Sequence, residues 1–148
     1  PLSAAMAAPP SPRSPAAGKA WHVLGAGSIG GLFALRMAAA GLPVALPTRG
    51  PGTPPRRLQA VMPGGGLLAH DFAVGGEARH LLVATKTGDT LEALAPQLPG
   101  DGDGRLVLLL QNGMGIADRL RARWPRLRLW VAVTTAGAWR DGDGTVHV

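Results

Sequence analysis

Three glycines at fixed spacing are the residues of this sequence best suited to bind a ligand. Gly25, Gly27 and Gly30 occupy the first, third and sixth positions of a turn between an apolar run and an apolar-periodic segment. The backbone N–H groups of such a turn, with the positive end of the helix that follows, can bind the pyrophosphate of a dinucleotide. The whole turn is therefore expected to bind a cofactor: Gly25, Ala26, Gly27, Ser28, Ile29 and Gly30.

Each glycine of this turn has its own expected role. Gly25 allows the tight turn, Gly27 lets phosphates approach a backbone without a Cβ, and Gly30 lets the helix pack closely on the strand. Glycine accounts for 22 of the 148 residues, so a glycine-rich turn without a ligand is the alternative. The strand before the turn and the helix after it favour the binding site.

Arg49 lies where a dinucleotide-binding unit usually recognises the ribose, about 20 residues past the glycines. Thr48 precedes it and no acidic residue is near. A carboxylate there would repel a 2′-phosphate, whereas a guanidinium pairs with it in a bidentate manner. Arg49 therefore favours NADP over NAD; the alternative is an ordinary surface arginine.

Lys86 and Asn112 each follow a predicted strand, at the edge of the sheet where open α/β folds bind ligands. Lys86 could hold an anionic cofactor or substrate. Asn112 could orient a carbonyl group or a ribose hydroxyl. As single residues both could equally be ordinary loop residues, but they share the edge on which the glycine turn is expected.

The elements that would position these residues alternate between strands and helices. Strands are expected at residues 20–24, 42–46, 67–69, 72–74, 78–84, 106–110 and 127–133, with a hairpin at 136–140 and 145–148. Helices are expected at 28–40, ended by Gly41, at 90–97, capped by Thr87 or Asp89, and at 116–124. Residues 50–66, rich in Pro and Gly, are expected to form a loop with at most a helical turn at 57–61.

This alternation predicts an α/β fold with a Rossmann-like, doubly wound and mostly parallel sheet. Residues 20–148 are expected to form the domain, with Trp124 and Trp130 as packing residues. Residues 1–19 are rich in Pro, Ala and Ser, and we expect a disordered leader.

Several function classes find no support in the sequence. The chain has no cysteine, its four histidines lack metal-binding spacing, and Ser28 lacks the hydrolase pattern GxSxG. We therefore expect neither a metal site nor a hydrolase. No apolar run approaches the roughly 20 residues of a membrane helix, and no secretory signal is evident, so a soluble cytoplasmic protein is expected.

Positive charge is concentrated in the first part of the chain. Residues 1–60 carry six basic and no acidic residues, whereas nine of each occur from Asp71 onward. A basic surface suits a polyanion, either a phosphorylated cofactor or a nucleic acid. Because the basic residues are scattered and lack interleaved aromatic residues, the cofactor is favoured and no nucleic-acid partner is expected.

Four segments give the chain a family resemblance. They are the glycine turn at 25–31, Leu-Leu-Val-Ala-Thr-Lys at 81–86, Leu-Gln-Asn-Gly-Met-Gly at 110–115 and Thr-Thr-Ala-Gly-Ala at 134–138. With them, residues 21–148 resemble the N-terminal domain of the ketopantoate reductase (2-dehydropantoate 2-reductase) family. The glycine turn is common to many reductases, whereas the second and third segments are far more specific.

The resemblance implies NADPH-dependent reduction of ketopantoate, a 2-keto acid, to pantoate in pantothenate and coenzyme A biosynthesis. It implies that the turn binds the pyrophosphate and that Arg49 binds the 2′-phosphate. Lys86 and Asn112 would contact the cofactor near the nicotinamide ribose, and Asn112 would also reach the substrate. Ala138, which only the resemblance suggests, would lie against the cofactor through its backbone.

The sequence departs from the family in one respect. Members continue into a helical C-terminal domain that supplies the lysine acting as general acid, whereas the lysines here are Lys19 and Lys86. We therefore expect this chain alone to bind NADP(H) weakly, to be inactive and to expose apolar surface, and its oligomeric state stays open. The alternatives are a related NADP-dependent 2-keto acid reductase and a non-catalytic nucleotide-binding module.

Overall fold

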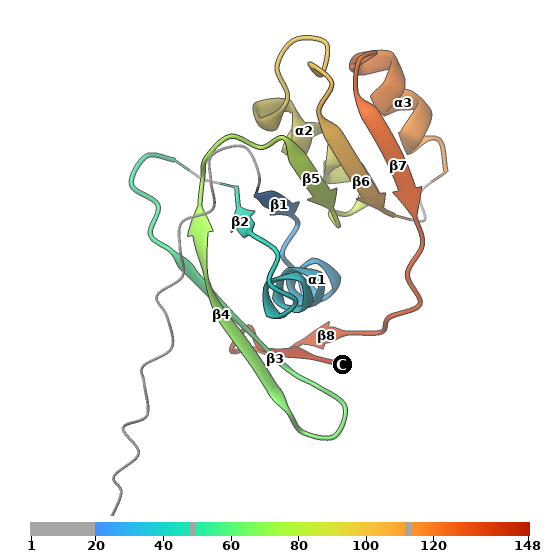
Figure 1. Cartoon of the computed structure of the whole chain (residues 1–148). Helices are drawn as coiled ribbons and strands as arrows, with labels where there is room; N and C mark the ends of the chain where they lie inside the picture. Colours follow the sequence, from blue (N-terminus) through green and yellow to red (C-terminus); the bar gives the residue numbers. More distant parts are fainter. Residues whose placement is uncertain (1–19, 48–49, 112–113) are drawn as a thin grey trace, which may run out of the picture.

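The computed structural model describes residues 20–47, 50–111 and 114–148, and the expectations for residues 1–19, Arg49 and Asn112 lie outside this part (Figure 1). The strands are β1 (Trp21–Leu24), β2 (Val44–Leu46), β3 (Arg56–Val61), β4 (Leu67–Val74), β5 (His80–Val83), β6 (Leu106–Leu110), β7 (Arg128–Ala132), β8 (Trp139–Arg140) and β9 (Val146–His147). The helices are α1 (Ser28–Ala39), α2 (Thr90–Leu94) and α3 (Ile116–Arg123), with 3-10 turns η1 (Thr87–Asp89) and η2 (Ala95–Gln97).

These strands form one nine-stranded sheet in the order β7-β6-β5-β1-β2-β4-β3-β9-β8. All pairs from β7 to β4 are parallel, which confirms the predicted Rossmann-like fold. The remaining strands add an antiparallel β3–β4 hairpin, a parallel β3–β9 pair and the predicted β8–β9 hairpin.

Helices pack on both faces of the parallel part of the sheet. Alternate residues of the central strands enter two separate cores: Leu24 packs with α2 and α3, whereas Val23 packs with α1. In Figure 1, α2 and α3 accompany β5, β6 and β7, and α1 lies beside β1 and β2. Central strands buried on both faces give the continuous apolar runs from which the sequence predicted them.

Helix α1 ends as its sequence predicts. Gly41 adopts a φ of +85°. Its N–H donates to Ala38 O at 3.0 Å and the Leu42 N–H donates to Met37 O at 3.0 Å, which is a Schellman motif. Since the left-handed conformation at Gly41 carries no Cβ penalty, the helix stops there and the chain turns toward β2.

The region 50–66 differs from the expectation, because β3 occupies part of the predicted loop. Strand β3 pairs antiparallel with β4 from Arg56–Phe72 to Val61–Leu67, and β4 is one strand rather than two. His70, which separates the two predicted short strands, therefore lies within β4. The first residues of β3 are exposed and its pairing partners are distant, so local alternation of apolar residues could not reveal this strand.

Two further expectations were wrong in detail. Helix α2 is shorter than predicted because Pro96 lies in the 3-10 turn that follows, and Asp89 precedes α2 without a side-chain capping bond. Trp124 is buried as expected, but Trp130 is 64% exposed because it lies on β7 at the edge of the sheet. Among the described helices, none has the length and apolar character needed to cross a membrane.

Candidate functional site

A cavity of about 950 Å³ opens at the carboxyl ends of β1, β2 and β5. The residues that follow these parallel strands meet there, as expected for the ligand-binding edge of an open α/β sheet. Seven residues expected to bind a cofactor line this cavity: Gly25, Ala26, Gly27, Ser28, Ile29, Lys86 and Ala138. Chain topology thus brings together residues from three separate parts of the sequence.

The glycines of the turn differ in what surrounds them. Gly25 has a φ of +79°, and a Cβ placed on it would lie 2.7 Å from the Thr85 backbone nitrogen. A Cβ on Gly30 would lie 2.0 Å from Gly25 O, so Gly30 packs behind the turn rather than lining the cavity. Gly27, by contrast, has no heavy atom within 4 Å of its ideal Cβ position.

The N-terminus of α1 lies at this open space, since Gly27, Ser28 and Ile29 line the cavity. Gly27 is its N-cap, no side chain caps the helix, and no acidic residue lies in the first turn. Its first N–H groups have no intrahelical acceptor, and the helix dipole places partial positive charge there. Open space at Gly27 and an uncapped helix end together suit a phosphate group.

The charged residues lining the cavity are mostly basic. Among the described residues, the charged side chains of the lining are Arg56 of β3, Lys86 after β5, Arg140 of β8 and one acid, Asp89. Arg140 Nη1 donates a hydrogen bond of 3.3 Å to the carbonyl oxygen of Ala26 in the glycine turn. Sequence reasoning missed Arg56 and Arg140, because only the sheet topology brings β3 and β8 to this edge.

A polar network fixes the loop that carries Lys86. Thr90, fully buried at the start of α2, donates from Oγ1 to Lys86 O at 3.1 Å. The Gln111 Nε2 group donates to Thr85 O at 2.6 Å and also to the hydroxyls of Thr85 and Thr90. These bonds join the carboxyl ends of β5 and β6 to α2, so the backbone of Lys86 is held in place.

A smaller hollow of about 250 Å³ adjoins the main cavity. It is lined by Leu110, Gln111, Ala132, Thr134 and Ala136 and shares Ile29 and Ala84 with the larger one. The combined space runs from the glycine turn toward the ends of β6 and β7. Such an elongated site suits a ligand with two linked parts.

Two of the histidines, His22 and His147, make hydrogen bonds within the fold. His22, buried in β1, donates from Nε2 to Gly75 O at 2.9 Å. His147 pairs with Asp141 at 2.9 Å in the β8–β9 hairpin. Within residues 20–47, 50–111 and 114–148, no three His, Asp or Glu side chains are grouped as a metal site would require.

A parallel sheet wound by helices on both faces, with a glycine turn after its first strand, defines a Rossmann-like α/β domain. Residues 21–148 match the family model described as "Ketopantoate reductase PanE/ApbA". The chain belongs to this family.

Individual relatives agree with this assignment. A curated 2-dehydropantoate 2-reductase of Saccharomyces cerevisiae is 36% identical over 73 residues, which cover 46% of this chain and 19% of the yeast protein. The 2-dehydropantoate 2-reductase of Geobacter metallireducens has a similar fold, with a TM-score of 0.68 at 21% identity over 86% of this chain and 45% of that one.

A second similar structure contains ligands. It is the ternary structure of D-mandelate dehydrogenase with NADH and anilino(oxo)acetate, with a TM-score of 0.68 at 21% identity over 86% of this chain and 45% of that one. The chain thus spans less than half the length of each of these relatives.

Proposed function

We propose that this chain is the cofactor-binding part of an NADPH-dependent 2-dehydropantoate 2-reductase. The observation that carries the proposal is the open backbone at Gly27 beside the uncapped N-terminus of α1, in a cavity at the carboxyl edge of the sheet. Membership of the ketopantoate reductase family supports the substrate, a 2-keto acid.

The proposed roles follow the residues of the cavity. The N–H groups of the glycine turn bind the pyrophosphate, and Ala138 lies against the cofactor through its backbone. Lys86, whose loop is fixed by the Thr90 bond, binds near the nicotinamide ribose. Two residues outside the described part complete the proposal: Arg49 binds the 2′-phosphate, and Asn112 contacts the nicotinamide ribose and the substrate.

The bound cofactor would supply the hydride, and the oxygen of the reduced keto group also needs a proton from a positioned acid. The lysine at the site, Lys86, is already given a cofactor-binding role, and we assign no general acid among the described residues. We therefore propose that the 148-residue chain alone binds NADPH without turning over substrate.

A second candidate has a specific observation in its favour. The similarity to D-mandelate dehydrogenase with NADH and anilino(oxo)acetate supports a related reductase acting on a different 2-keto acid. This candidate would use NADH, unlike the NADP-dependent relative that the sequence leaves open as an alternative. NADH has no 2′-phosphate, so it would gain nothing from a guanidinium at position 49.

The decisive experiment titrates the chain with NADPH and NADH in parallel, before and after Arg49→Ala. We expect NADPH to bind at least about tenfold tighter, a difference of about 1.4 kcal/mol. Arg49→Ala should remove most of this preference and leave NADH affinity unchanged. Arg57→Ala, which removes an exposed arginine paired with Asp71, is the matched control and should leave the preference intact.

Each contrary outcome rejects a defined part of the proposal. Equal affinity for both nucleotides would reject NADP specificity and favour the second candidate. A chain that binds neither nucleotide would reject the cofactor role itself. Binding without turnover of ketopantoate, even by a longer reading frame that includes this chain, would instead favour a non-catalytic nucleotide-binding module.

A further inference from the structure

Arg140 joins the far end of the chain to the glycine turn. It is the last residue of β8, it lines the cavity, and its Nη1 donates to Ala26 O, 114 residues earlier in the sequence. Ala26 lies in the turn between β1 and the N-cap of α1. A guanidinium is therefore held directly beside the backbone N–H groups proposed to bind a pyrophosphate.

The hairpin that carries Arg140 is itself firmly anchored. Asp141 Oδ1 accepts hydrogen bonds of 3.0 Å from the N–H groups of Asp143 and Thr145, and Asp141 Oδ2 lies 2.9 Å from His147 Nε2. Val146 of β9 is buried against the core of α1 and pairs with Ala60 of β3. The backbone at Arg140 is thus fixed before any ligand arrives.

The charge of Arg140 has no acidic partner within the part of the chain that the structure describes. Five other arginines form ion pairs with carboxylates: Arg57, Arg79, Arg105, Arg121 and Arg126. Arg140 instead donates to a carbonyl beside the positive end of α1. Two positive groups at one place repel each other, and an anion between them converts that repulsion into attraction.

We propose that Arg140 binds the pyrophosphate of the dinucleotide and positions the glycine turn for it. A guanidinium has five N–H donors, so one can hold Ala26 O while others reach a phosphate oxygen. This inference rests on the proposed cofactor role of the cavity. NADH and NADPH both contain the pyrophosphate, so Arg140 strengthens the binding of both nucleotides. Arg49 differs, because its proposed partner is the 2′-phosphate, which only NADPH has.

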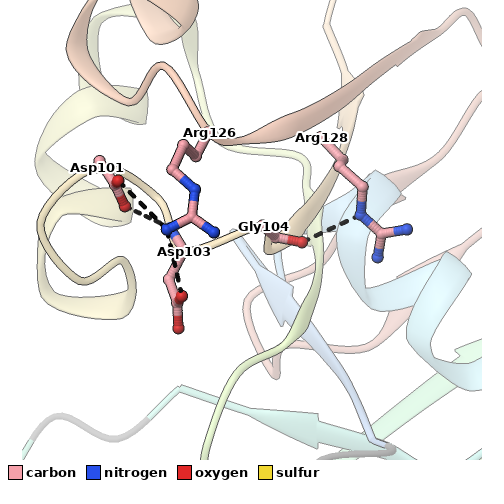
Figure 2. A network of polar contacts seen from close by, with 5 residues as sticks. All are labelled: Asp101, Asp103, Gly104, Arg126 and Arg128. Carbon is pink, nitrogen blue, oxygen red and sulfur yellow. Dashed lines mark hydrogen bonds and ion pairs between the residues drawn. The ribbon is translucent and has the colours of Figure 1, made fainter.

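The test compares Arg140→Gln with a matched arginine at the other end of the sheet. Arg128 of β7 also donates from its guanidinium to a backbone carbonyl, that of Gly104 at 3.0 Å (Figure 2). Arg128→Gln therefore removes the same charge and the same kind of bond away from the cavity. Affinities for NADPH and NADH are measured for both variants and the unsubstituted chain at low and high salt.

Arg140→Gln is expected to lower the affinity for both nucleotides by a similar factor, about fivefold to tenfold, and to reduce the salt dependence of binding. Arg128→Gln should change neither affinity by more than about twofold. Arg140→Lys keeps the charge but loses the fork of donors, so its affinities should lie between those of Arg140→Gln and the unsubstituted chain. This variant also separates binding from folding if Arg140→Gln is unstable.

Arg140→Gln with unchanged affinity for both nucleotides would overturn this inference and leave the cofactor role standing. Loss confined to NADPH would also overturn it, because the contact would then be to the 2′-phosphate. If the unsubstituted chain binds neither nucleotide, the proposed function fails first, and the inference fails with it.

Discussion

The two ends of the parallel strands differ in how their charged side chains are paired. At the amino ends of β5, β6 and β7, three arginines are paired with acids: Arg79, Arg105 and Arg126. Arg126 contacts Asp101 at 3.5 Å and Asp103 at 3.9 Å, as Figure 2 shows. Glu77 accepts from Arg79 at 2.9 Å and from Arg105 at 3.2 Å.

At the carboxyl ends of the same sheet the balance is different. Of the residues that the structure describes, Arg56, Lys86 and Arg140 line the cavity together with one acid, Asp89, and the N-terminus of α1 there has no side-chain cap. Ion pairs at the amino ends tie loops to each other, and their charges are satisfied within the chain. The surplus of basic over acidic residues in the cavity lining is what an anionic ligand needs.

The largest effect is expected from replacing one glycine by alanine at each end of the parallel strands. Gly30→Ala places a Cβ 2.0 Å from Gly25 O, and Gly102→Ala, at a φ of +99°, places one 3.0 Å from Leu127 N. Each should lower the free energy of unfolding by about 2 kcal/mol or more, measured by urea denaturation. Only Gly30→Ala should abolish nucleotide binding, because Gly102 lies at the amino ends.

Gly27→Ala is the control that separates stability from binding. The Cβ position of Gly27 is open, so the free energy of unfolding should stay within about 0.5 kcal/mol. Nucleotide affinity should nevertheless fall by at least about tenfold, since the methyl group occupies the space proposed for a phosphate. Retained affinity in Gly27→Ala would contradict the placement of the pyrophosphate, and lost affinity in Gly102→Ala would contradict the contrast between the two ends.

A smaller effect on stability is expected from lowering the pH, and it involves one aspartate at each end, Asp141 and Asp101. The hydrogen bond from His147, with N–H donors of Thr145 and Asp143, lowers the pKa of Asp141 below its ordinary value of 3.8. At the amino ends, the Asp103 N–H, aided by Arg126, likewise lowers the pKa of Asp101. A carboxyl group with a lowered folded-state pKa stabilises the fold above its unfolded value, and this is lost as pH falls through the folded value.

The melting temperature should therefore fall as pH is lowered below about 4, and Asp141→Asn and Asp101→Asn should each flatten part of that decline. Only Asp141→Asn should also weaken nucleotide binding at neutral pH, because Asp141 anchors the hairpin of Arg140. If a variant shows the same dependence of melting temperature on pH as the unsubstituted chain, the substituted aspartate does not stabilise the fold through the hydrogen bonds described for it.

The smallest effect is expected from breaking the ion pairs of Figure 2. The side chain of Arg126 is 64% exposed, so solvent screens its contacts with Asp101 and Asp103. Arg126→Ala should lower the free energy of unfolding by less than about 1 kcal/mol and leave NADPH affinity unchanged. Altered NADPH affinity would show that charges at the amino ends influence binding in the cavity, which would contradict the distinction between the two ends.

Much of the parallel sheet could be predicted because its signals are local. Strands β1, β5 and β6 are short apolar runs buried on both faces, and Gly41 marks the end of α1 by its left-handed conformation. The glycine turn is likewise recognised from glycines close together in the sequence, between an apolar run and an apolar-periodic segment. These features depend on residues close in sequence, so periodicity and glycine positions are sufficient to find them.

The other half of the sheet depended on distant partners. Strand β3 begins with two exposed arginines and gains its hydrogen bonds from β4 and β9, so its own sequence resembles a loop. Trp130 shows the reverse error, because its apolar character predicts burial but its edge position leaves it exposed.

The same division applies to the site. The glycine turn, Lys86 and the family could be recognised from the sequence, since the covalent order of the motif residues defines them. The tertiary structure alone decided that Arg140, more than a hundred residues further along, lies against Ala26 and that Gln111 and Thr90 fix the backbone of Lys86. Strand order and register create these contacts, and both arise from pairing between segments that carry no local sign of each other.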